Sequence, residues 1–324
     1  MIKHLESKKG QNAQINNDMK KILIILTIIS ICYSYGQKFI MLDSLSVKFK
    51  IREYTLNTKA LYGIDKNINV YNIFVDNKRI LLLSILPERE GYSTYKKEIT
   101  DYEKLVKVVS VGASEKNEKK ESNWKKINFD EIKNNIVTIS NINYMTSEWE
   151  IANTPDKKTF SYSLVKRIGD SYYVSENCLT EFFTIANVQS PLIAPYGTIN
   201  ISEPKVSIKQ MKEIFKNRFP DFSFPLDIDS IGMRYLDISF SLHNYFSKEY
   251  IIKGKKAFQF WTLDGWWYQD GLNEYRGIDR FVFIPEKGIV GGSYDFYFRK
   301  FNILNTLLWD NIINEKVMIA EELK

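Results

Sequence analysis

Cys178 and His243 are the two residues of this chain whose side chains could act together in nucleophilic catalysis. Cys178 lies in "SENCLTEFF", which predicts a helix start, where the helix dipole lowers the pKa of a thiol. A histidine elsewhere in the chain can serve as the base that activates the thiolate. The pair defines one hypothesis, a cysteine hydrolase. The alternative is a structural Cys178, because free cysteine is among the most buried residue types.

The inventory of side chains argues against metal and nucleotide sites. The chain has two histidines and two cysteines, and His4 and Cys32 precede residue 37, where we expect the mature chain to begin. The remaining pair cannot supply the several His or Cys ligands of a zinc site. The sequence has no G-x-x-x-x-G-K-[ST] loop, no G-x-G-x-x-G fingerprint and no G-x-S-x-G nucleophile elbow. We therefore expect no metal and no cofactor.

Acidic residues gather in the second half of the chain and could provide a pair for glycoside hydrolysis, which needs two carboxylates about 5 to 9 Å apart. Asp264 and Asp270 occupy turn positions, however, where aspartate bonds to its own backbone, so a structural role is favoured. The acidic residues form two clusters in the sequence, over 221–229 and over 264–279, and neither follows the spacing of a calcium loop. The residues concerned are Asp221, Asp227, Asp229, Asp264, Asp270, Glu274 and Asp279.

The stretch "LDGWWYQDG", residues 263–271, predicts an aromatic β-hairpin. A type I′ turn at Asp264-Gly265 pairs Leu263 with Trp266 and Trp261 with Tyr268. Because side chains alternate along a strand, the two adjacent tryptophans point to opposite faces. The first face then holds Trp261, Leu263, Trp266 and Tyr268, and the second holds Phe258, Phe260, Thr262 and Trp267.

Two interpretations of this hairpin stay open. Both faces can be covered, since large aromatic side chains mostly serve cores and cross-strand pairs. Alternatively one face is exposed, and an exposed apolar patch marks a binding site for a glycan or for a partner's side chains. On the second interpretation the predicted binding residues are Trp261, Trp266 and Tyr268.

The first half of the chain predicts strands with one helix. Alternation predicts a strand at 46–54, and two apolar runs around Asp76–Lys78 predict a hairpin. Helical spacing predicts a helix over 95–109, and the mixed charges of 114–126 indicate a solvated loop. Further antiparallel strands are predicted at 134–142 and on both sides of Ile168–Asp170.

The second half begins after a proline-rich stretch, 187–205. Ser207 is the predicted cap of a helix that ends before Pro220, and residues 231–246 fit either a helix or a strand. Strands are predicted at 255–263, 280–284 and 292–298, with a turn at Pro285–Gly288. Residues 301–318 predict an amphipathic helix.

Strands that are neighbours in sequence, joined by short turns and accompanied by few helices, predict an α+β fold with antiparallel sheets. The aromatic share of 14% also favours β structure. We expect two regions of similar size, an N-terminal α+β region over 37–190 and a C-terminal α+β region over 200–324 with the aromatic β-meander.

The first 36 residues predict a leader and signal peptide that is removed. From Met19 the chain has two lysines, an apolar run over Ile22–Ile31, and then the small residues Ser34 and Gly36. The run is shorter than the about 20 residues that span a bilayer, so we expect no membrane span after cleavage. A lipoprotein anchor at Cys32 is disfavoured, because the preceding Ile31 is large.

Removal of the leader lowers the net charge. Residues 1–36 hold five lysines against one Glu and one Asp, so the +6 of the full chain becomes +3. No concentrated basic run indicates a nucleic-acid partner. We expect an exported bacterial protein, periplasmic or extracellular, that binds a cell-surface protein or glycan without catalysis. The alternatives are the cysteine hydrolase and a structural envelope component.

Overall fold

The computed structural model describes residues 37–87, 123–151, 158–186, 197–221, 224, 243–263, 277–298 and 303–324. Its largest sheet has the strand order β10-β9-β4-β3-β2, and β6 also pairs with β9. All pairs are antiparallel except β10 with β9. The strands are β2 (Lys50–Asn57), β3 (Asn67–Phe74), β4 (Arg79–Ile85), β6 (Lys158–Thr159), β9 (Cys178–Ile185) and β10 (Thr198–Ile199).

The predicted β3–β4 hairpin is confirmed. Phe74 pairs with Ile80, and the Asp76 carboxylate accepts hydrogen bonds from the backbone N–H groups of Lys78 and Arg79, both at 2.8 Å. β4 is buried along its whole apolar run, because it lies inside the sheet and both of its faces are covered.

The strand predicted at 46–54 begins later than expected. Residues Leu42–Ser46 form the short helix α2, and the N–H groups of Lys48 and Phe49 donate to the carbonyl of Leu45. This helical turn places Val47 in solvent, 86% exposed, while Phe49 is buried. The alternating apolar residues before Lys50 therefore do not belong to a strand, and β2 begins only at Lys50.

A second sheet has the order β1-β7-β8-β5. The predicted hairpin around Ile168–Asp170 is confirmed, since β7 and β8 pair antiparallel and Gly169 adopts φ +59° in the turn. The solvated loop predicted to Lys126 ends earlier, because β5 pairs with β8 from Trp124. The strands are β1 (Lys38–Met41), β5 (Trp124–Ile127), β7 (Tyr162–Ile168) and β8 (Ser171–Ser175).

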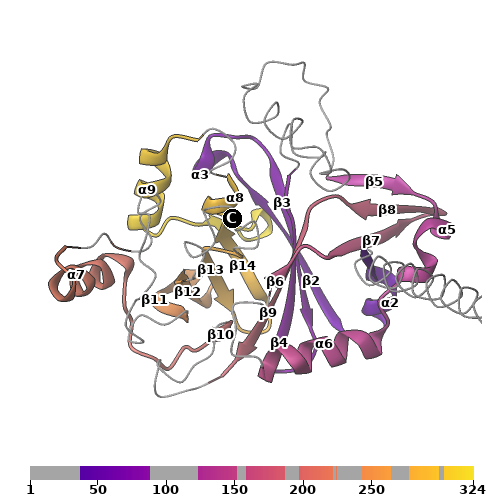
Figure 1. Cartoon of the computed structure of the whole chain (residues 1–324), viewed down its shortest axis with the longest axis horizontal. Coiled ribbons are helices and arrows are strands. Elements are labelled where there is room, and N and C mark those ends of the chain that lie inside the picture. Colours follow the sequence, from indigo (N-terminus) through magenta and orange to yellow (C-terminus); the bar gives the residue numbers. More distant parts are fainter. Residues whose placement is uncertain are drawn as a thin grey trace, which may run out of the picture. The chain divides into compact units, whose positions relative to one another are not determined.

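The strand predicted at 134–142 is wrong, because this stretch is mostly helical and only Ile136 forms an isolated parallel bridge, with Phe39. The short helix α5 (Phe129–Ile132) is followed by the 3-10 helix η2 (Lys133–Asn135) and by α6 (Ile139–Ile151). Thr138 Oγ1 accepts from the N–H of Asn141, whose side chain accepts from the N–H of Thr138. This reciprocal pair has the geometry of a capping box and begins the helix. In Figure 1, α6 runs across the lower ends of the strands of the largest sheet, where it contacts β9.

The third sheet has the order β11-β12-β13-β14-β15. The predicted strands at 255–263 and 280–284 are confirmed, as is the turn after Pro285. Lys253 and Gly254 both have positive φ, which makes the β11–β12 connection a type I′ turn. The strands are β11 (His243–Ile252), β12 (Lys255–Leu263), β13 (Arg280–Ile284), β14 (Gly288–Ser293) and β15 (Met318–Ile319).

The strand predicted at 292–298 is wrong after Ser293. Tyr294 donates its N–H to the Tyr62 hydroxyl, and Phe296 donates its N–H to the Asp279 carboxylate at 3.2 Å. These side-chain acceptors take the donors that a strand would give to a neighbour. The chain therefore leaves the sheet and forms the short helix α8 (Asp295–Phe298).

The helices predicted after Ser207 and near the C-terminus are confirmed in type, although the second is shorter than the predicted range. Ser207 and Gln210 form a capping box at the start of α7 (Ile208–Arg218). The helix at the C-terminal end is α9 (Asn305–Ile313). Two further short elements are α3 (Lys59–Tyr62) and the 3-10 helix η6 (Glu321–Leu323). The helix predicted over 95–109 lies outside the described residues.

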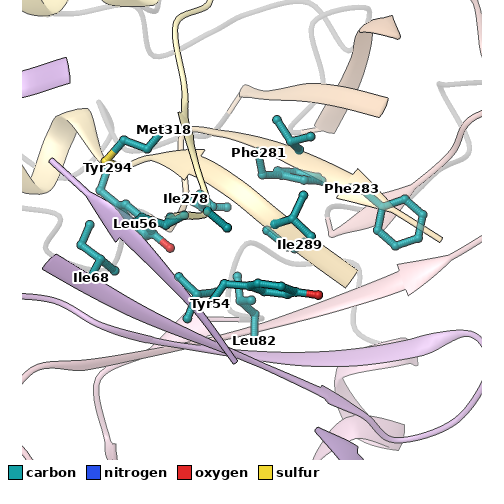
Figure 2. Close-up of a cluster of buried hydrophobic side chains, with 14 of the residues drawn as sticks. Tyr54, Leu56, Ile68, Leu82, Ile278, Phe281, Phe283, Ile289, Tyr294 and Met318 are labelled. Atoms are coloured by element: carbon teal, nitrogen blue, oxygen red, sulfur yellow. The ribbon is translucent and has the colours of Figure 1, made fainter. Parts of the chain in front are cut away.

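The main core lies between the largest sheet and the third sheet. Figure 2 shows Tyr54, Leu56 and Leu82 of the largest sheet facing Phe281, Phe283 and Ile289 of the third sheet. A separate cluster, with Tyr71, Ile73 and Leu83, packs on the opposite face of the largest sheet against α6. Three mainly antiparallel sheets with helices packed on them confirm the predicted α+β class. Within the described ranges, no helix is long and apolar enough to cross a membrane.

Candidate functional site

Trp261, the first predicted binding residue, lies in the core. It is 1% exposed, stacks on Tyr245 with ring centroids 4.5 Å apart, and donates its indole N–H to the carbonyl of Val206 at 2.8 Å. Residues of α7 and α9 belong to the same buried cluster. The cover above Trp261 leaves neither face of its ring to a ligand.

The predicted pairing of Trp261 with Tyr268 is wrong. Trp261 pairs with Tyr245 on one side and with Arg280 on the other, so both edges of β12 are already occupied at this position. A strand has only two edges, and the hairpin partner proposed from the Asp-Gly turn has no place here. The expected alternation does hold in the described part of β12. Trp261 and Leu263 face one cluster, and Phe258 and Phe260 face another.

The other two predicted binding residues, Trp266 and Tyr268, lie outside the described residues. The same is true of Asp264, Asp270 and Glu274. Their proposed roles stay predictions.

Cys178 does not begin a helix. It is the first residue of strand β9, where it pairs with Ile85 of β4, and it is fully buried in the cluster on the α6 side of the sheet. The dipole that would have lowered its thiol pKa is therefore absent from its own segment. The Sγ atom of Cys178 lies 4.0 Å from the hydroxyl oxygen of Thr180.

His243 is fully buried at the start of β11. Its Nε2 lies 3.0 Å from Oε2 of Glu203, and the other carboxylate oxygen of Glu203 accepts the N–H of Phe246 at 2.7 Å. The His243 ring also meets the Tyr245 ring edge-on. Cys178 therefore belongs to the cluster on the α6 side of the largest sheet, whereas His243 bonds to Glu203 and packs against Tyr245, a member of the cluster around α7.

The described acidic residues are divided between core and surface. Asp279 is buried and accepts the N–H of Phe296, whereas Asp221 is exposed at the end of the α7 segment. Asp227 and Asp229 lie outside the described residues. The described chain holds no group of three or more His, Cys, Asp or Glu side chains arranged to bind a metal ion.

A polar groove of about 520 Å³ lies beside β2 and was not predicted from the sequence. We name it the basic groove. Its walls are β2, the first residue of β12, the turn between β13 and β14, and the 3-10 helix η6. It is lined by Lys50, Ile51, Arg52, Glu53, Tyr54, Lys255, Pro285, Glu286, Lys287, Glu322 and Leu323.

Four cations line the basic groove, and none of them forms an ion pair with the described chain: Lys50, Arg52, Lys255 and Lys287. Lys50 lies over the ring of Phe74, 5.2 Å from its centroid. All four are exposed or partly exposed. Since Lys50, Arg52 and Tyr54 are alternate residues of one strand, their side chains share a face.

Two of the three carboxylates in the groove are already bound to other groups. Glu53 accepts the Tyr71 hydroxyl at 2.7 Å, on the opposite face of the sheet from Tyr54. Glu322 accepts the N–H of Thr55 with both oxygens, at 3.0 and 3.2 Å. The third, Glu286, lies in the β13–β14 turn with φ +64°.

Tyr54 joins two walls of the groove. Its hydroxyl donates to the carbonyl of Lys287 at 3.2 Å. Burial raises the pKa of Tyr54, Arg52 opposes the rise, and Glu322 adds to it. The phenol therefore stays neutral at physiological pH and serves as a hydrogen-bond donor that holds the β13–β14 turn against β2.

The sequence contained a partial signal for this groove. Lys50 and Arg52 are alternate residues of the predicted strand, but their face of β2 continues with the buried Tyr54 and Leu56. Lys255 and Lys287 come from segments far away in the chain. No local pattern indicates that they meet.

In comparisons with known proteins, no family model, no curated protein and no solved structure matches this chain.

Proposed function

We propose that this chain is an exported, non-catalytic binding protein that recognises an anionic group of a cell-surface partner in the basic groove. The carrying observation is the convergence of Lys50, Arg52, Lys255 and Lys287 from separate segments on one groove without ion pairs to the described chain. These four cations stand against three carboxylates, Glu53, Glu286 and Glu322, so the groove has a net charge of +1. Cations that have no ion pair of their own attract an anionic partner and raise its rate of association.

Export is supported by the leader pattern, with its lysines, short apolar run and small residues at 34 and 36. Mass spectrometry of the chain recovered from a bacterial host with a secretory pathway tests this part. We expect a mature N-terminus at Gln37. An uncleaved chain in the cytoplasm would contradict it.

The binding role is tested with polyanions of defined chemistry, poly-L-glutamate and alginate, on immobilised full chain. We expect binding that weakens strongly between 50 and 200 mM salt, because exposed charges are screened over about 10 Å at 0.1 M. The triple variant Arg52→Gln, Lys255→Gln, Lys287→Gln should bind about tenfold more weakly, since each tenfold loss corresponds to about 1.4 kcal/mol shared among three contacts.

The matched control changes three exposed lysines away from the groove by the same net charge, Lys125→Gln, Lys126→Gln and Lys216→Gln. It should retain nearly all of the affinity. Equal losses in both triple variants would mean that binding follows net charge alone, and the basic groove would then not be the site.

A further inference from the structure

The edge of the largest sheet runs along the basic groove. β2 is the last strand of that sheet, and its residues Lys50 to Tyr54 line the groove consecutively. In Figure 1, β2 passes beside β14 of the third sheet. The groove therefore combines a strand edge with four cations and three carboxylates.

The outward backbone groups of this edge follow from the ladder. The N–H of Thr58 donates to the carbonyl of Lys66, so in the β2–β3 register the hydrogen-bonded positions of β2 are the even-numbered ones. The N–H and carbonyl groups of Ile51, Glu53 and Thr55 thus point away from β3. Thr55 agrees with this pattern, because its N–H is bound by Glu322.

Ile51 and Glu53 keep outward groups that no described residue binds. Ile51 is half-buried and Glu53 is exposed. Glu322 bonds to the edge in the way that the carbonyl of a neighbouring strand would, but only at Thr55. An unpaired edge is a template for another extended chain.

The charges beside the edge select what can pair with it. A strand added to β2 would project alternate side chains over Lys50 and Arg52, with Lys255 and Lys287 on the facing wall. Acidic side chains at those positions form favourable cross-strand pairs. A second copy of β2 is disfavoured, because it would place Lys50 and Arg52 opposite like charges.

We propose that the partner contributes an extended acidic segment, with carboxylates at alternate residues, that adds to β2 as a further strand. This inference rests on the proposed function of the basic groove. The open stretch from Lys50 to Tyr54 spans about 17 Å at about 3.3 Å per residue, which suits a segment of about five residues. Its remaining side chains would lie on the Ile51 side of the sheet, so apolar residues fit there.

The test uses a capped hexapeptide that alternates Glu and Val, and two N-methylated isomers of it. One isomer is methylated at the Glu residues and the other at the Val residues. Both keep the charge and composition, but each blocks the N–H groups of one edge of the peptide. We expect one isomer to bind the full chain like the parent and the other about tenfold more weakly, because only one edge pairs with β2.

Hydrogen exchange by NMR provides the second measurement. The amides of Ile51 and Glu53 should be slowed about tenfold or more by the parent peptide, and not by the weaker isomer. Arg52→Gln, Lys255→Gln, Lys287→Gln should weaken the parent peptide and the stronger isomer alike.

The outcomes separate the two proposals. Equal binding by both isomers, or a preference for alginate over every peptide, would overturn strand addition while leaving a groove that binds anions. Failure of the peptide and of both polyanions to bind would overturn the proposed function itself.

Discussion

Trp261 stacks on its cross-strand partner Tyr245, with ring planes 20° apart, and covers the face of β12 that α7 packs against. This stacked pair connects the third sheet to the helix. Because the indole is buried and its N–H is bound, removing it leaves both a cavity and an unpaired carbonyl at Val206.

Trp261→Ala should therefore lower the free energy of unfolding by about 3–5 kcal/mol, as truncations of buried aromatics do. Trp261→Phe should cost less, because a ring is kept. Trp309→Ala is the control, since Trp309 is only partly buried on the same cluster and should cost less than half as much. Urea unfolding measures all three, and a loss below about 1 kcal/mol at Trp261 would contradict its core role.

A second prediction concerns the buried ion pair of Arg280 and Asp295. The Asp295 carboxylate also accepts the Tyr62 hydroxyl at 2.9 Å, and Arg280 donates its Nε–H to the carbonyl of Lys316. Burial works against the charged guanidinium, but Asp295 outweighs it and raises the pKa of Arg280. Asp295→Ala would leave a buried charge without its partner, which costs about 3–5 kcal/mol of unfolding free energy.

The control for this buried ion pair is an ion pair on the surface. Lys133 and Asp130 are 2.8 Å apart on the surface, and Asp130→Ala should change stability by less than about 1 kcal/mol. Thermal unfolding of both variants gives the comparison. If the two substitutions cost the same, the buried pair has no special weight in the fold.

Cys178 provides the third prediction. A thiol that is fully buried in the core is inaccessible to alkylating agents. Peptide mapping after iodoacetamide treatment should find Cys178 unmodified in the folded chain and modified in urea. Rapid alkylation under native conditions would show access to the site and would return attention to the cysteine hydrolase hypothesis.

Local turn chemistry was predictable from the sequence. The β3–β4 and β7–β8 hairpins follow directly from short polar turns between apolar runs, and Ser207 was predicted as the cap of α7. α6 was missed because a short apolar run fits strand and helix periods alike. The available signal in the sequence was Thr138 followed three residues later by Asn141, the two residues that bond reciprocally in the structure. Asn is not the usual partner in a capping box.

Long-range pairing was not predictable. The type I′ turn of this region lies at Lys253-Gly254, so β11 pairs with one edge of β12. The predicted hairpin at Asp264-Gly265 would have needed an open edge of β12. An Asp-Gly pair indicates a turn but carries no information on which strand edges are still open. The basic groove is of the same kind, because Arg52 and Lys287 meet only through packing of the two sheets.

The last prediction concerns pH and the Asp76 turn. Burial raises the pKa of Asp76, but hydrogen bonds from the N–H groups of Lys78 and Arg79 and from the Arg79 guanidinium outweigh it, so the pKa is lowered. A folded-state pKa below the unfolded value contributes stability above pH about 3.9 that is lost as the pH falls through the folded-state value. Asp76→Asn keeps the turn geometry and removes only the charge.

At pH 7 Asp76→Asn should destabilise the chain by less than about 1 kcal/mol, because the carboxylate is partly exposed and its ion pair is screened by solvent. The difference between wild type and variant should shrink as the pH falls from 5 toward 3, since the wild-type carboxylate becomes protonated. Asp43→Asn, in the exposed helix α2, is the control variant that removes the same charge away from this turn. A difference that grows on acidification would mean that Asp76 is stabilised in its protonated form, contrary to the hydrogen bonds at this turn.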